Sequence, residues 1–178
     1  MKKILTFTAL TILSATFAAA QTPAADTGYT ATLRNSWNSV KQYVAASAEK
    51  MPAEHYAFKP TPEVRSFGQL IGHLANEHYL LCAPLKGEPN PMAKVDFEKT
   101  TAKPDLIKAI NESNAYCDAA YAAAKDEAKT IAPFSETRRD TPFRTMLLNV
   151  THDNEHYGNM ITYLRMKGIV PPSSTPTR

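Results

Sequence analysis

The sequence lacks several features that would place it in a familiar class. It has no C-x-x-C pair, no internal repeat, no clustered stripe of lysine and arginine, and no convincing alternation of apolar and polar residues that would predict strands. Arg138-Arg139 is an isolated basic pair, so we do not expect a nucleic acid partner. Without a C-x-x-C pair, a thioredoxin-like redox motif or a zinc knuckle is poorly supported.

The first twenty residues have the pattern of a secretory signal. A basic start, "MKK", precedes an uncharged and mostly apolar run at 4–17, and "AAA" at 18–20 supplies the small residues that a signal peptidase needs. The run is short for a membrane span, which needs about 20 residues, and an uncleaved anchor is the alternative. No cysteine follows the cleavage site, so a lipid anchor is not expected. We predict an exported protein, periplasmic or secreted, with no stable membrane anchor after cleavage.

Cleavage after position 20 leaves 158 of the 178 residues, a length that suits one domain with a real core. It removes two lysines and no acidic residue, so the formal charge falls from +3 to +1. We predict that the domain occupies residues 21–170 and that residues 171–178 form a disordered tail.

The chain has two cysteines, Cys82 and Cys117. An even number of cysteines in an exported chain is compatible with one disulfide, and we favour a bond between these two. The alternative is a pair of buried thiols, because free cysteine packs as a small apolar residue.

Four segments carry apolar residues at the three- and four-residue spacing of helices. Boundary signals support them: "SFGQ" at 66–69 is a capping box, Thr141-Pro142 is a good helix start, and Gly168 is a good helix end. We expect Pro84 to lie just beyond the second helix. The predicted fold is therefore an all-α four-helix bundle, with helices at about 30–51, 66–83, 104–127 and 141–168.

The connection at 85–102 is long for a compact domain. A loop of this length needs a reason. A crossover that lets the second and third helices run parallel is one such reason.

Four of the five histidines fall on the second and fourth predicted helices. His152 and His156 are four residues apart, so both point to the same side of one helix. Two imidazoles on one turn are prealigned ligands for a divalent transition metal, although such a pair is more often structural or exposed to solvent. The motif is not H-E-x-x-H, because the first histidine is followed by Asp153.

A catalytic metal usually takes three protein ligands, so a third must come from another helix. The second helix offers His73 and His78. Helical spacing puts His78 near the middle of the apolar face and His73 near its edge. A site at the border of the core, open to a cleft, fits His73 better, but this spacing does not decide between them.

The chain resembles the DinB-like (DinB/YfiT) family in two stretches. "FKPTPEVRSFGQLIGHLA" at 58–75 is similar to the lead-in and second helix of that family, and "HDNEHYGNMITYLRMKGIVPPSS" at 152–174 to its last helix and exit. The order of helices and the long link match as well, so the resemblance covers essentially the whole mature chain. It implies a four-helix bundle with parallel second and third helices.

The resemblance also implies a metal site and a chemistry. Many family members bind a divalent metal, often zinc or nickel, through one histidine of the second helix and two from an H-x-x-x-H on the last. In this sequence those positions are His73, His152 and His156. Some relatives transfer or isomerise groups with low-molecular-weight thiols of the cytoplasm, where the metal lowers the pKa of the thiol. The predicted signal peptide differs from that pattern, because an exported protein has no obvious supply of those cytoplasmic thiols. Relatives often dimerise, so a homodimer is expected.

Three functions remain open at this point. The first is a metal-dependent hydrolase or thiol S-transferase acting on an unknown small molecule or thiol. The second is a non-catalytic bundle that binds a metal or small ligand, with a stress-related role, and the third is a structural bundle without metal. For an enzyme, Glu77, Glu155 or Tyr163 can supply an acid or base, and Glu77 is preferred because it shares a face with His73. The alternative for both glutamates is a solvated charge on a helix face.

Overall fold

The computed structural model describes residues 28–127, 131 and 140–175. Within these ranges the protein is all-α, as predicted, and the only bridge outside the helices joins Ile131 to Asp140. The four long helices are α1 (Tyr29–Lys50), α2 (Phe67–Lys86), α3 (Lys103–Ala123) and α4 (Pro142–Met166). Three short 3₁₀ helices accompany them: η1 (Ala53–His55), η2 (Phe97–Lys99) and η3 (Pro172–Ser174).

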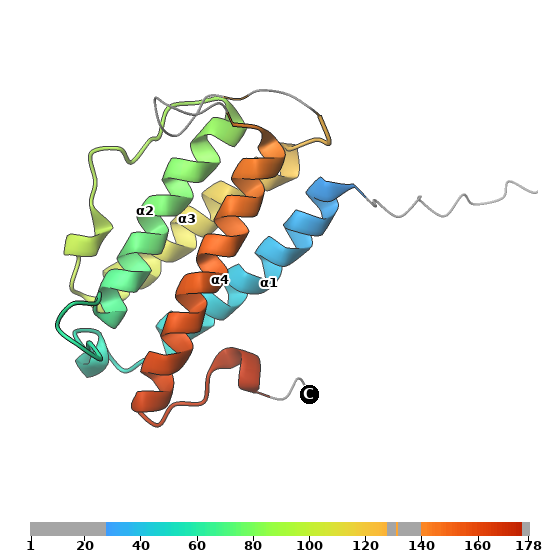
Figure 1. Ribbon diagram of the computed structural model, residues 1–178. Helices are drawn as coiled ribbons and strands as arrows, with labels where there is room; N and C mark the ends of the chain where they lie inside the picture. Colours follow the sequence, from blue (N-terminus) through green and yellow to red (C-terminus); the bar gives the residue numbers. More distant parts are fainter. Residues whose placement is uncertain (1–27, 128–130, 132–139, 176–178) are drawn as a thin grey trace, which may run out of the picture.

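The helices pack as a bundle in which α2 and α3 run in the same direction and α1 and α4 run in the opposite one (Figure 1). The link from α2 to α3 returns along the side of the bundle and carries η2 (Figure 1). This return brings the start of α3 back beside the start of α2. The long connection thus has the crossover role that its length indicated.

The core lies between the four helices and is closed by the segment after α1. Trp37 of α1 stacks on Tyr121 of α3, with ring centroids 5.2 Å apart, and both side chains are fully buried. Tyr56, which follows η1, is also buried, and its hydroxyl donates a hydrogen bond to the Ala48 carbonyl at 2.6 Å. The segment between α1 and α2 is therefore an ordered cover at one end of the bundle.

The helix starts follow the sequence signals. The Ser66 hydroxyl accepts a hydrogen bond from the Gln69 backbone N–H, and the Gln69 side chain accepts one from the Ser66 N–H, so the predicted capping box is present. The Thr141 hydroxyl accepts from the Arg144 N–H at the start of α4. These bonds satisfy backbone donors that have no partner within the helix.

The end of α2 differs from the prediction. Pro84 lies inside the helix, which continues to Lys86 and ends at Gly87 with φ at 73°. A proline removes one backbone donor, and so close to the end of a helix it costs only one intrahelical hydrogen bond. Gly87 adopts the left-handed conformation and donates its N–H to the Ala83 and Pro84 carbonyls, which ends the helix.

The chain after α4 is partly ordered, although residues 171–178 were expected to form a disordered tail. Residues 171–175 contain η3, and the Tyr157 hydroxyl of α4 donates to the Ser173 hydroxyl at 2.7 Å. Residues 176–178 and the predicted signal at 1–20 lie outside the described ranges. No helix in the described part of the chain is long and apolar enough to cross a membrane.

Cys82 of α2 and Cys117 of α3 form a disulfide, and both residues are fully buried. The bond joins the two parallel helices across 35 positions of sequence. Because α2 and α3 are connected by the long link, this bond closes a large loop that the unfolded chain would otherwise leave free.

We expect the Cys82→Ala, Cys117→Ala double variant to lose about 4 kcal/mol of unfolding free energy, the value that chain entropy gives for a loop of this size. Chemical denaturation followed by circular dichroism measures the loss. The control is Ser39→Ala, a substitution on the exposed side of α1. Equal denaturation midpoints for the wild type and the double variant would show that the bond does not stabilise the fold.

Candidate metal centre

Three histidines from two helices converge at one place in the bundle. His73 lies on α2, and His152 and His156 lie one turn apart on α4. The Nε2 atom of His152 is 3.2 Å from that of His73 and 3.1 Å from that of His156. The structure therefore brings together the same three residues that the resemblance singled out.

The spacing of these nitrogens fits a transition metal. Three nitrogens at zinc-ligand distances of about 2.1 Å and tetrahedral angles lie roughly 3.4 Å from one another. One ligand atom from each histidine lies within 4.8 Å of the others. A set of imidazole nitrogens also matches the ligand preference of zinc and nickel. The three residues thus fit a divalent metal ion in both distance and chemistry.

Glu98, on η2, orients the first of these rings. Its carboxylate accepts a hydrogen bond from Nδ1 of His73 at 2.9 Å. A carboxylate can only accept, so Nδ1 of His73 carries the proton and the lone pair of Nε2 faces the other two histidines. A carboxylate behind a ligating histidine is the usual partner that sets the tautomer and the ring orientation at metal sites.

A close approach between the link and α2 puts Glu98 in this position. A Cβ on Gly72 would lie 2.3 Å from the Phe97 carbonyl oxygen, so only glycine permits this contact. One turn further along α2, the Asn76 side chain accepts from the Phe97 N–H and donates to Asp96. Gly72 and Asn76 therefore hold η2 against α2 on either side of His73.

The environment keeps the three imidazoles neutral. Burial lowers the pKa of His73 and of His152 below the ordinary value. Burial, followed by the neighbouring histidines, lowers the pKa of His156 to about 4. A neutral imidazole is the form that binds a metal, so these residues are ready to act as ligands near pH 7.

Glu98 stays ionised for a different reason. Burial acts to raise the pKa of its carboxyl, but hydrogen bonds from Arg65 and His73 outweigh this and lower it. Arg65 donates to both carboxylate oxygens, from Nε at 2.9 Å and from Nη2 at 3.3 Å. Arg65, Glu98 and His73 thus form a connected chain of polar groups that ends at the cluster.

His78, the alternative ligand considered from the sequence, has a different role. It is fully buried, and its Nε2 lies 3.1 Å from both carboxylate oxygens of Asp153 on α4. Its Nδ1 is hydrogen-bonded to the Ser113 hydroxyl of α3 at 3.0 Å, and the Trp37 ring of α1 meets it edge to face. His78 therefore ties the helices together in the core and does not belong to the cluster.

Glu77, the preferred acid or base from the sequence, is half-buried and lies apart from the cavity that His156 lines. It borders a smaller hollow with Asn76 and Met92. Burial raises the pKa of its carboxyl, and no hydrogen bond joins it to the three histidines among the residues described. A catalytic role for Glu77 stays a prediction.

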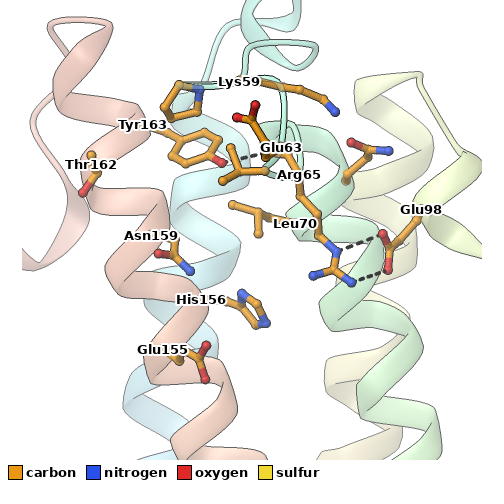
Figure 2. A pocket seen from close by; sticks show the side chains of 13 residues that line it. Lys59, Glu63, Arg65, Leu70, Glu98, Glu155, His156, Asn159, Thr162 and Tyr163 are labelled. Carbon is orange, nitrogen blue, oxygen red and sulfur yellow. Dashed lines mark hydrogen bonds and ion pairs between the residues drawn. The ribbon is translucent and has the colours of Figure 1, made fainter.

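A cavity of about 730 Å³ opens beside the cluster (Figure 2). Its walls come from the segment before α2, from α2 itself, from η2 and from α4, and His156 reaches it from α4. The volume is in the range of small-molecule sites. The lining residues are Lys59, Pro60, Glu63, Val64, Arg65, Gln69, Leu70, Glu98, Glu155, His156, Asn159, Thr162 and Tyr163.

Sequence reasoning missed Glu98 and Arg65. Glu98 lies in the link, where no periodicity or motif distinguishes it from other acidic residues. The unusual length of the link between α2 and α3 is the only sequence feature that points to a functional residue there. Of the other suggested residues, Glu155 lines the cavity, and Tyr163 lines it while donating its hydroxyl hydrogen to the Arg65 carbonyl at 2.6 Å. Burial raises the pKa of Tyr163, which keeps its hydroxyl protonated.

A substitution at His78 tests whether this residue stabilises the fold or binds the metal. We expect His78→Ala to lower the unfolding free energy by about 3 kcal/mol or more, because it leaves the buried Asp153 carboxylate without its partner. Denaturant melts measure the change. The folded variant should bind as much zinc per chain as the wild type. The control is His55→Ala, a half-buried histidine on η1. Equal stability of the two variants would contradict this role.

A comparison with curated proteins finds no match. The sequence model of one family, described as the DinB superfamily, matches residues 32–160. The match runs from α1 into α4 and contains all three histidines of the cluster, the Glu98 link and the disulfide. Because it covers well over half of the chain, the protein belongs to the DinB superfamily.

Proposed function

We propose that the protein is an exported metalloenzyme, a hydrolase or thiol S-transferase that uses a divalent metal, zinc or nickel, on His73, His152 and His156. The observation that carries this proposal is the position of the three-histidine cluster at the side of a cavity large enough for a small molecule. Three protein ligands next to a cavity match catalytic sites, whereas structural sites usually have four.

The metal would supply one kind of chemistry: it acts as a Lewis acid that lowers the pKa of a coordinating water or thiol. The protein residues supply the rest. Glu98 holds the proton on Nδ1 of His73 and so presents Nε2 for ligation. The buried, apolar side chain of Leu70 forms part of one wall, and Glu155 on α4 offers a carboxylate for proton transfer.

A non-catalytic role is the second candidate. In that case the same three histidines hold a metal for structure, or the cavity stores a small ligand, in a stress-related function. A fourth protein ligand would favour this role because it closes the coordination sphere. Glu77 and His78, which lie on the same helix as His73, are the candidates for that position. The pairing of His78 with Asp153 in the core takes His78 away from that position, which supports the enzyme instead.

Metal analysis tests the site directly. We expect wild-type protein, purified after incubation with zinc or nickel, to carry about one metal ion per chain, as a three-ligand site of this kind would. The His152→Ala, His156→Ala double variant should carry almost none, because a single remaining imidazole is a weak ligand. Inductively coupled plasma mass spectrometry measures the content.

The control is His55→Ala, which should keep the full metal content. Equal, negligible metal in the wild type and the double variant would refute the site. If the site binds metal, the cobalt-substituted protein tests whether a position is open. A thiolate-to-cobalt absorption band upon addition of 2-mercaptoethanol supports the enzyme, and a spectrum that thiol does not change supports the closed, non-catalytic site.

Export is the remaining part of the proposal and rests on the sequence at 1–20. We expect the mature protein to begin at Gln21, since "AAA" precedes this residue. N-terminal sequencing of protein from the extracytoplasmic fraction measures this. The control replaces Ala18 and Ala20 by bulky residues, which should block cleavage. An uncleaved chain that begins at Met1 and stays in the cytoplasm would contradict export.

A further inference from the structure

Arg65 lines the cavity next to the metal centre, and only two of its three guanidinium nitrogens donate hydrogen bonds to Glu98. Its Nε and Nη2 atoms donate to Glu98, as described above. Nη1 has no hydrogen-bond partner within the described ranges, and Figure 2 shows this third nitrogen directed away from Glu98, toward the side of His156. The side chain is 41% exposed, so a ligand in the cavity can reach it. Arg65 therefore presents a free donor edge next to the cluster.

The position of this edge is fixed before any ligand arrives. The Glu98 carboxylate holds the guanidinium by two hydrogen bonds, and the Tyr163 hydroxyl holds the Arg65 backbone carbonyl from α4. The next residue, Ser66, is the cap of α2. A donor group that is already ordered loses little conformational entropy on binding, which favours recognition of a ligand at that point.

The charges around the cavity are unevenly distributed. Lys59, Glu63 and Glu155 are exposed on the cavity wall, where solvent screens them. Arg65 is near the histidines, because the Glu98 carboxylate accepts hydrogen bonds both from Arg65 and from Nδ1 of His73. A divalent metal on these histidines would add positive charge at the same end. In the metal-free protein the Glu98 carboxylate offsets the charge of Arg65, so the end of the cavity beside the cluster would become electropositive when a metal binds.

We infer that the cavity binds a small molecule through an oxyanion group, a carboxylate or phosphate, which accepts hydrogen bonds from the free edge of Arg65. A planar guanidinium matches both groups in geometry. On the other wall, Asn159 and Thr162 lie along the cavity side of α4 and can donate further hydrogen bonds to the same molecule. This inference deepens the proposed function by naming the substrate class of the same site, but the Arg65 contact itself does not require a metal.

The test follows binding of two probes, succinate and inorganic phosphate, by nuclear magnetic resonance of the backbone amides of Asn159 and Tyr163. Each protein is titrated both without metal and loaded with zinc. We expect saturable binding to the wild type in both forms, and about tenfold weaker binding to Arg65→Gln, as loss of a charged hydrogen-bond donor predicts. Arg65→Lys should bind with intermediate affinity, because it keeps the charge and loses the planar fork. Lys94→Gln removes one positive charge from the exposed link and is the matched control.

The Glu98→Gln variant distinguishes two binding modes of the probe: an anion bound to Arg65 and an anion bound to the metal. This variant removes the carboxylate that competes for Arg65, so the probes should bind it more tightly in the metal-free form. The same variant should hold zinc about 10- to 100-fold more weakly, because Glu98 orients His73. Opposite changes in the two affinities support the inference. Circular dichroism checks that each variant is folded.

Three results would overturn the inference. The first is equal probe affinity of Arg65→Gln and wild type. The second is binding that needs zinc and ignores Arg65, which would make the probe a metal ligand. The third is no saturable binding of either probe to the wild type. A difference between succinate and phosphate, with both dependent on Arg65, identifies which oxyanion the cavity prefers. Loss of metal binding alone would refute the proposed function and leave the metal-free titrations to decide this inference.

Discussion

The packing of α2 against α4 is the constraint on which the functional part of this protein depends. His73 comes from one helix and His152 and His156 from the other, and their nitrogens meet only at one relative rotation of the two helices. Moving one residue along a helix turns the side chain by about 100°. The buried pair of His78 and Asp153 joins the same two helices, five residues after His73 and one residue after His152. A buried polar contact therefore stabilises the packing of the two helices that carry the site.

The link between α2 and α3 combines a topological role with a chemical one. It carries the chain back along the bundle so that α3 runs parallel to α2, and on the way it delivers Glu98 to His73. Gly72 allows the link to touch the helix, and Asn76 anchors it there. The disulfide between Cys82 and Cys117 stabilises the same pair of helices further along. The long link between α2 and α3 is thus part of the site.

Much of the architecture could be predicted from the sequence because it follows local rules. The capping box at Ser66, the threonine cap at Thr141 and the three- and four-residue spacing of apolar side chains each act within one or two turns of helix. The predicted end of α2 at Pro84 is wrong, because a proline so near the end of a helix costs only one hydrogen bond. The left-handed Gly87 sets the actual end. The edge position of His73 and the central position of His78 also followed from the helical period.

The sequence by itself determined the helices, their faces and the two helices that carry the histidines, because these depend on spacing along the chain. Spacing alone did not choose between His73 and His78, and the resemblance to the DinB-like family made that choice. Only the tertiary structure decided that Glu98 lies behind His73, that Arg65 connects it to the cavity, and that His78 is bound to Asp153. Those contacts join residues 25 to 75 positions apart, and no local sequence pattern predicts which carboxylate of a loop will contact which histidine ring.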